Sequence, residues 1–289
     1  AGHFGPWYLG FFCAIVAVGM VPVPRNQRLV LEIIQQMKTH MALRLGELTA
    51  SRIQTLASMF VSQEQVLDPD PSTWHPGDGE LIYYVRSVEL LVGLARGQGS
   101  EALTNKPVVN WMYRPADVIH LLLQVHYPAH DSGFSIFCRL RTQWLQYVHV
   151  MVYDVEANLF DEELLGSPVH VEFFQVLQEE LEEALDLVPA DQADADGPPL
   201  DEGKNEYLLA LLRCVDSFYQ TAFPTLRNCE LCHELAEAAQ ELPKKFSRIV
   251  RQGPGQFVPR RGLRDPDFLQ TIALRVLSAT GGRPQSMVA

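Results

Sequence analysis

An uncharged run near the start of the chain constrains the fold more than any other stretch. Residues 4–23 (FGPWYLGFFCAIVAVGMVPV) carry no formal charge, and Arg25 and Arg28 follow them at once. About 20 apolar residues, each adding about 1.5 Å of helix, cover the ~30 Å hydrocarbon core of a bilayer. Trp7 and Tyr8 have the amphipathic rings that favour one membrane interface. We therefore expect a transmembrane helix over residues 4–23.

Two other structures are compatible with the same run. A helix buried in the core of the protein would also be apolar on all sides. A cleaved secretory signal fits less well, because no small-residue cleavage site follows directly. Pro6 and Pro22 leave only a short uninterrupted helix between them.

The remainder of the sequence is dominated by helical periodicity. Apolar residues recur at three- and four-residue steps, and no alternation of strands with helices is found. The one plausible strand or bend is VVNWMY at residues 108–113, directly after Pro107. We expect an all-α protein, in which the N-terminal transmembrane helix precedes an irregular multi-helix body. The expected helices cover residues 29–48, 51–67, 80–96, 115–127, 132–160, 167–188, 205–223, 224–242 and 265–279.

Charge and composition suggest how this chain is divided. The net charge of −12 argues against a nucleic-acid partner. Ten acidic residues and no base lie within residues 179–202, and residues 189–203 (PADQADADGPPLDEG) lack an apolar face. We expect an anchor at 4–23, a helical body at 25–188, an acidic linker at 189–203 and a C-terminal helical unit at 204–289.

The C-terminal unit contains a basic segment between residues 244 and 264. Seven bases lie within these twenty-one residues, without an acid among them. Such a cluster is costly unless an anionic lipid surface or an acidic neighbouring subunit offsets it, although a solvated tail is the simpler alternative. The candidate contact residues are Lys244, Lys245, Arg248, Arg251, Arg260, Arg261 and Arg264.

One short motif is associated with cofactor chemistry. Cys229, Cys232 and His233 form a CxxCH sequence, which resembles the attachment site of a c-type haem. The two thiols would bind the haem edge and the imidazole would ligate the iron. A lone CxxC supplies only half of a tetrahedral metal site, and buried cysteines beside a helical histidine are the simpler interpretation. We expect no cofactor and no metal, with haem c as the alternative.

The catalytic motifs of several large enzyme classes are missing from the sequence. It contains no GxSxG, HExxH, GxxxxGK[ST] or GxGxxG pattern. From this absence, the expected anchor, and the acidic and basic segments that could pair with neighbours, we expect a non-catalytic, membrane-anchored accessory or scaffold subunit of a large energy-transducing, respiratory-type complex. Its expected partners are the other subunits and the bilayer, which includes anionic lipid. The alternatives are a membrane-tethered haem electron carrier and a soluble helical adaptor.

The arginines beside the uncharged run also predict an orientation. Arg25 and Arg28 follow it and no base precedes it, so the positive-inside rule puts the body on the matrix side of the mitochondrial inner membrane, or the equivalent side of another energy-transducing membrane.

Overall fold

The structure, a computed structural model, is predominantly helical, as the sequence predicts. Its contacts divide the chain into two compact units, residues 1–126 with 131–155 and residues 127–130 with 156–289. The described residues are 6–18, 21–36, 49, 51–53, 55, 78–97, 100–125, 136–155, 161–186 and 202–222.

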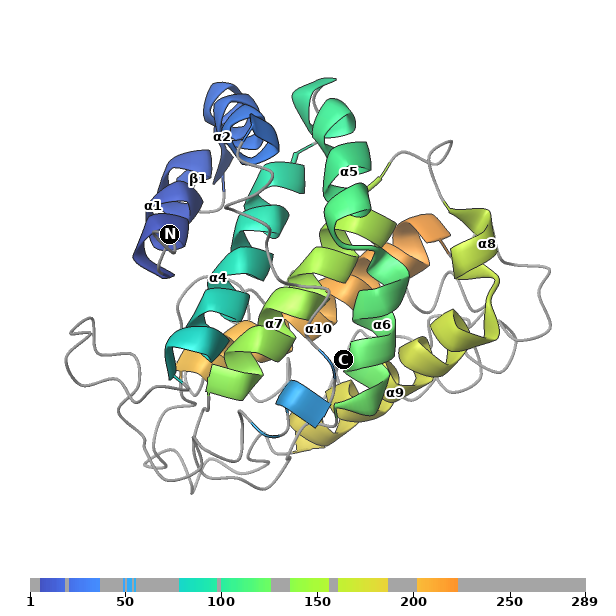
Figure 1. Ribbon diagram of the computed structural model, residues 1–289. Helices are drawn as coiled ribbons and strands as arrows, with labels where there is room; N and C mark the ends of the chain where they lie inside the picture. Colours follow the sequence, from blue (N-terminus) through green and yellow to red (C-terminus); the bar gives the residue numbers. More distant parts are fainter. Residues whose placement is uncertain are drawn as a thin grey trace, which may run out of the picture. The chain divides into compact units, whose positions relative to one another are not determined.

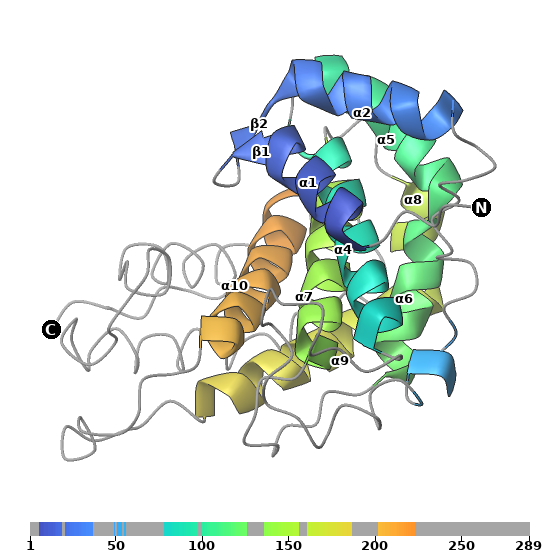
Figure 2. The same cartoon turned by 60° about the vertical axis from the view of Figure 1, so that its left-hand side comes forward.

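The described residues of the first unit form helices and one short hairpin near its start (Figures 1 and 2). The last helix, α7, continues directly into a π-helical turn, η3. In chain order the elements are α1 (Pro6–Val16), β1 (Ala17–Val18), β2 (Val21–Pro22), α2 (Pro24–Gln36), α4 (Asp78–Ala95), α5 (Ser100–Met112), α6 (Pro115–Gln124), α7 (Ile136–Val148) and η3 (His149–Tyr153).

Helix α4 lies at the centre of this unit. It contacts α1, α2, α5 and α7, and Figures 1 and 2 both show α1 running beside it. Its apolar side chains are buried around the whole helix rather than along one stripe, as expected for a helix surrounded by others. The buried apolar residues are Leu81, Ile82, Tyr84, Val85, Val88, Leu90, Leu91, Val92, Leu94 and Ala95.

The expected transmembrane helix over residues 4–23 is not confirmed. Helix α1 covers Pro6–Val16 only, and these eleven residues span about 16 Å, roughly half of a bilayer core. The chain then reverses in the antiparallel hairpin of β1 and β2, where Val18 pairs with Val21. Among the residues that the structure describes, no helix is both long and apolar enough to cross a membrane.

Part of the apolar surface of α1 packs against α4. Leu9 and Val16 are each 1% exposed, and a Cβ atom added to Gly93 of α4 would lie 2.7 Å from Cγ2 of Val16. The close approach of the two helices therefore needs a glycine at position 93. One face of the uncharged run is thus buried against α4, which corresponds in part to the alternative of a buried helix.

The strand or bend expected at residues 108–113 is also wrong. These residues belong mostly to α5, which contains Pro107 in its interior. Asn105 and Lys106, just before the proline, are both buried and bonded to other segments of the unit. Tertiary contacts therefore hold this segment helical across a residue that normally breaks a helix.

The second unit contains α8 (Glu162–Leu165), α9 (Pro168–Asp186), α10 (Glu202–Ser217) and a π-helical turn, η6 (Phe218–Ala222). Ser167 caps α9, since its Oγ accepts a hydrogen bond from the His170 amide at 3.2 Å. Helices α9 and α10 contact each other. The rings of Phe174 and Phe218 stack with their centroids 3.8 Å apart.

The segment between α9 and α10 is where the sequence predicts the acidic linker. Residues 187–201 lie outside the described part of the chain. The helices on either side of them belong to one compact unit. The domain boundary at 189–203 stays a prediction.

Candidate interaction surface

The motif of Cys229, Cys232 and His233 and the basic segment at residues 244–264 both lie outside the described residues. Within the described part of the chain, no three histidine, cysteine or acidic side chains gather as a metal site would require. The His120 side chain, for example, is exposed on α6 and belongs to no such group.

The buried polar side chains of the first unit act mainly at helix ends. At the C-terminal end of α4, Gln27 Nε2 donates hydrogen bonds to the carbonyl oxygens of Gly93 at 2.6 Å and Arg96 at 3.0 Å. Asn105 Nδ2 donates to the carbonyl of Leu94 at 3.1 Å. The last carbonyls of a helix lack partners within it. Two side chains from α2 and α5 therefore complete the bonding of α4.

The carbonyls at the ends of other helices also receive hydrogen bonds from side chains of neighbouring helices. The buried Arg141 of α7 donates to the carbonyls of Leu122 and Val125 at the end of α6. On α2, Asn26 donates to the carbonyl of Ile15, near the end of α1, at 2.8 Å. Because each donor comes from a different helix than its acceptor, these bonds fix how neighbouring helices pack.

Lys106 and Tyr147 donate hydrogen bonds to carbonyls that directly follow two further helical elements. Lys106 Nζ donates to the carbonyl of Asp154, just after η3, at 2.5 Å. The hydroxyl of Tyr147 donates to the carbonyl of Tyr113, just after α5. A cation near a helix C-terminus also interacts favourably with the helix dipole, so both hydrogen bonding and charge favour Lys106 in this place.

Burial controls the electrostatics of these groups. Desolvation lowers the pKa of Lys106, and the charge of Asp154 partly opposes the shift. Desolvation raises the pKa of Tyr147 and of Cys13. The raised pKa keeps the Cys13 thiol protonated and unreactive near neutral pH. The chemistry of this interior is therefore structural, as far as the described residues extend.

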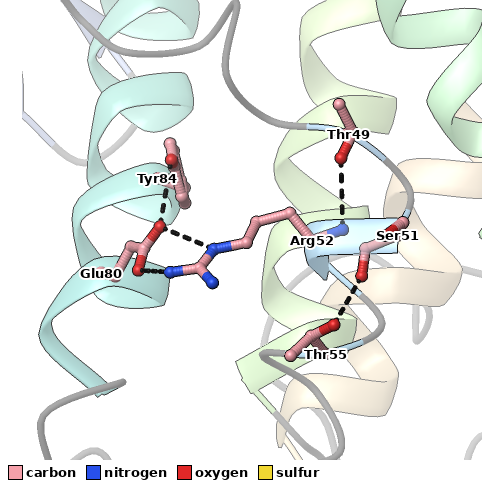
Figure 3. Close-up of polar contacts among 6 residues, drawn as sticks. All are labelled: Thr49, Ser51, Arg52, Thr55, Glu80 and Tyr84. Atoms are coloured by element: carbon pink, nitrogen blue, oxygen red, sulfur yellow. Dashed lines mark hydrogen bonds and ion pairs between the residues drawn. The ribbon is translucent and has the colours of Figure 1, made fainter.

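On the surface, an ion pair joins the segment around residue 52 to the start of α4 (Figure 3). Arg52 Nε donates to Glu80 Oε1 at 3.1 Å, and its NH2 group pairs with Glu80 Oε2. The Tyr84 hydroxyl lies 3.4 Å from the same Oε1 atom. The hydrogen bonds and charge of Glu80 raise the pKa of Arg52. This is an exposed contact of the kind that adds little stability.

Among the residues that the structure describes, exposed large apolar side chains are grouped on α1 and the hairpin. Tyr8 is 57% exposed, Phe11 is 61% exposed, and Val18 and Val21 are each 66% exposed. Ala14, one helical turn beyond Phe11, is exposed as well. Residues 8, 11 and 14 follow the three-residue spacing that puts side chains on one face of a helix. We call these five residues the N-terminal apolar surface.

Sequence reasoning identified the uncharged run but did not predict which of its residues would be exposed. The run is apolar on both sides, so its pattern does not distinguish the face packed against α4 from the opposite face. The spacing of Tyr8 and Phe11 was the available signal. It becomes meaningful only once Leu9 and Val16 are known to be buried.

No model of a known protein family matches the chain, and no curated protein matches it significantly in sequence.

Proposed function

We propose that this protein is a non-catalytic accessory or scaffold subunit of a larger membrane complex. The observation that carries the proposal is the use of its buried polar side chains. Gln27, Asn105, Lys106 and Arg141 all donate to main-chain carbonyls at the ends of neighbouring helices. Such bonds make a rigid helical body, and a rigid body is what a scaffold requires to present surfaces to its neighbours.

The same observation weighs against a catalytic role for the buried polar side chains that the structure describes in the first unit. Catalytic acids, bases and nucleophiles must be accessible to a substrate and have a pKa suited to proton transfer. Here Lys106 is bonded to the chain itself, and burial raises the pKa of Cys13 and Tyr147. The respiratory type of the complex, the mitochondrial inner membrane and the matrix-side orientation stay predictions from the sequence.

The basic segment supplies the second half of the proposal. We propose that its seven bases contact an acidic neighbouring subunit or anionic lipid, because a cluster without acids is otherwise self-repelling. Reversing the charge of Lys244, Lys245, Arg260 and Arg261 should reduce incorporation into the complex. Unchanged incorporation would make the segment a solvated tail.

A native gel of membranes solubilised in mild detergent tests the subunit proposal. The protein in its source cells should migrate in an assembly several times larger than its own 32.5 kDa. The purified chain alone is the matched control. It should migrate at a smaller mass, because only a homo-oligomer would give the large mass without other subunits. Migration of the cellular protein at the mass of the purified chain would refute the proposal.

The CxxCH motif favours one competing function, a haem-carrying electron-transfer protein. Covalently attached haem would give the purified protein a visible absorption spectrum that persists after denaturation. A colourless protein purified from its source cells excludes this function, and Cys229→Ser should abolish any haem absorption that is found.

A further inference from the structure

The N-terminal apolar surface lies on an element that is already half buried. Leu9 and Val16 pack into the first unit, while Tyr8 and Phe11 remain more than half exposed on the other side of the same helix. A helix that is apolar on all sides is normally covered on all sides. Exposed large apolar side chains on such a helix therefore indicate an interaction site.

The hairpin extends this surface beyond the end of α1. Val18 and Val21 are direct cross-strand partners and are equally exposed. Figure 2 shows the hairpin following α1 at the edge of the first unit, with α2 leading away from it. The surface thus has a helical part and a strand part, and both present apolar side chains.

The chemistry of the surface fits lipid better than protein. Residues 6–24 contain no charged side chain, and the Tyr8 hydroxyl is the only polar side-chain group among the five residues of the surface. Protein interfaces usually carry about one hydrogen bond per 100–200 Å² and a polar rim. The side chains of this surface offer few donors or acceptors for such bonds. Tyr8 adds an amphipathic ring of the kind that is enriched at membrane–water interfaces.

The charges that follow the surface on α2 match an anionic bilayer, and the ion pair of Arg86 and Glu89 on α4, which lies beside Gly10 and Cys13 of α1, adds no net charge. Arg25 and Arg28 are exposed on the first turns of α2, directly after the hairpin. The nearest acid on that helix, Glu32, is also exposed but lies a further turn away from the hairpin. Anionic headgroups attract basic residues that lie within about one Debye length of the bilayer surface.

We propose that the N-terminal apolar surface binds the interface of an anionic lipid bilayer, with α1 lying in the membrane plane. Phe11 and Tyr8 would enter the boundary between headgroups and acyl chains, about 5–10 Å deep. Arg25 would lie among the headgroups. The inference shares a membrane location with the proposed function but depends on a different surface, so either can fail without the other.

Flotation of the purified full-length chain with lipid vesicles provides the test. The wild-type protein should float with vesicles of phosphatidylcholine and phosphatidylserine, and more weakly with phosphatidylcholine alone. Phe11→Glu should lower the partition coefficient by about tenfold or more, because it replaces a ring that enters the bilayer with a charge. Phe11→Leu should retain binding, and Arg25→Glu should weaken binding only where phosphatidylserine is present.

Trp111→Glu is the matched control for Phe11→Glu. Trp111 is 76% exposed on α5, so the same kind of substitution is made at an exposed aromatic residue outside the proposed surface. Its flotation should equal that of the wild type. Circular dichroism of both variants should show unchanged helix content, as expected for changes at exposed side chains.

Hydrogen exchange of the wild-type protein tests the same inference without any substitution. Vesicles should slow exchange of the amides in residues 6–22. Protection of residues 244–264 alone, or equal flotation of Phe11→Glu and the wild type, would overturn the proposal. It would also be overturned if Phe11→Glu lowered the molecular mass in solution without changing flotation, since the surface would then bind a second copy of the chain.

Discussion

Gln27 offers the sharpest test of how the first unit is held together. Its side chain is 1% exposed and bridges two carbonyls at the end of α4, those of Gly93 and Arg96. Gln27→Met keeps the length of the side chain and removes both donors. The substitution therefore leaves the volume of the site nearly unchanged while breaking both hydrogen bonds.

The expected cost follows from the surroundings of the two carbonyls. A buried acceptor that loses its donor costs about 1–3 kcal/mol, and the Gly93 carbonyl lies in a buried bond. The hydrogen bond to the Arg96 carbonyl is only partly buried, so a water molecule can replace part of the hydrogen bonding that the carbonyl loses. Burying a thioether instead of an amide returns about 1 kcal/mol. We expect a net loss of about 2 kcal/mol in the free energy of unfolding.

Urea denaturation followed by tryptophan fluorescence measures this loss, because Trp144 is fully buried in the same unit. The matched control is Gln35→Met, which makes the same change at an exposed position of the same helix. It should alter the stability by no more than about 0.5 kcal/mol. If Gln27→Met were as stable as Gln35→Met, the bonds to α4 would contribute nothing and the reasoning would be refuted.

Three further predictions concern other parts of the chain. Gly93→Ala should destabilise the protein by about 1–3 kcal/mol because its Cβ would lie 2.7 Å from Val16 Cγ2, and adding Val16→Ala should recover part of that loss. Gly10→Ala, whose Cβ would meet nothing closer than 3.9 Å, should be neutral or stabilising; thermal melts measure both variants, and equal melting temperatures would contradict this account. Burial lowers the pKa of His170 from 6.5 to about 4, so the unfolded state binds more protons and stability should fall by about 3 kcal/mol as the pH drops from about 6.5 to about 4. His170→Leu should flatten this dependence in urea titrations, and an unchanged slope would exclude His170 as its cause. Limited proteolysis should cut first within residues 189–203, whereas first cuts in α7 would remove the predicted boundary.

The sequence by itself determined the helical class and the position of several helices. The expected helices at residues 80–96, 115–127 and 167–188 correspond to α4, α6 and α9. Proline at a first helical turn and a serine cap are local signals, and Pro115, Ser167 and Pro168 act at the helix starts where the sequence predicts them. Such signals need no knowledge of distant residues.

Tertiary structure alone decided what the uncharged run does. An apolar sequence is equally suited to a bilayer and to the side of another helix, because both remove its side chains from water. The run ends as a helix at Val16 and packs against α4, where Gly93 leaves space for it. The same is true of Gln27 and Arg141, whose acceptors lie in other helices. A contact between residues far apart in the chain leaves no periodic mark on either segment, so only the folded arrangement reveals it.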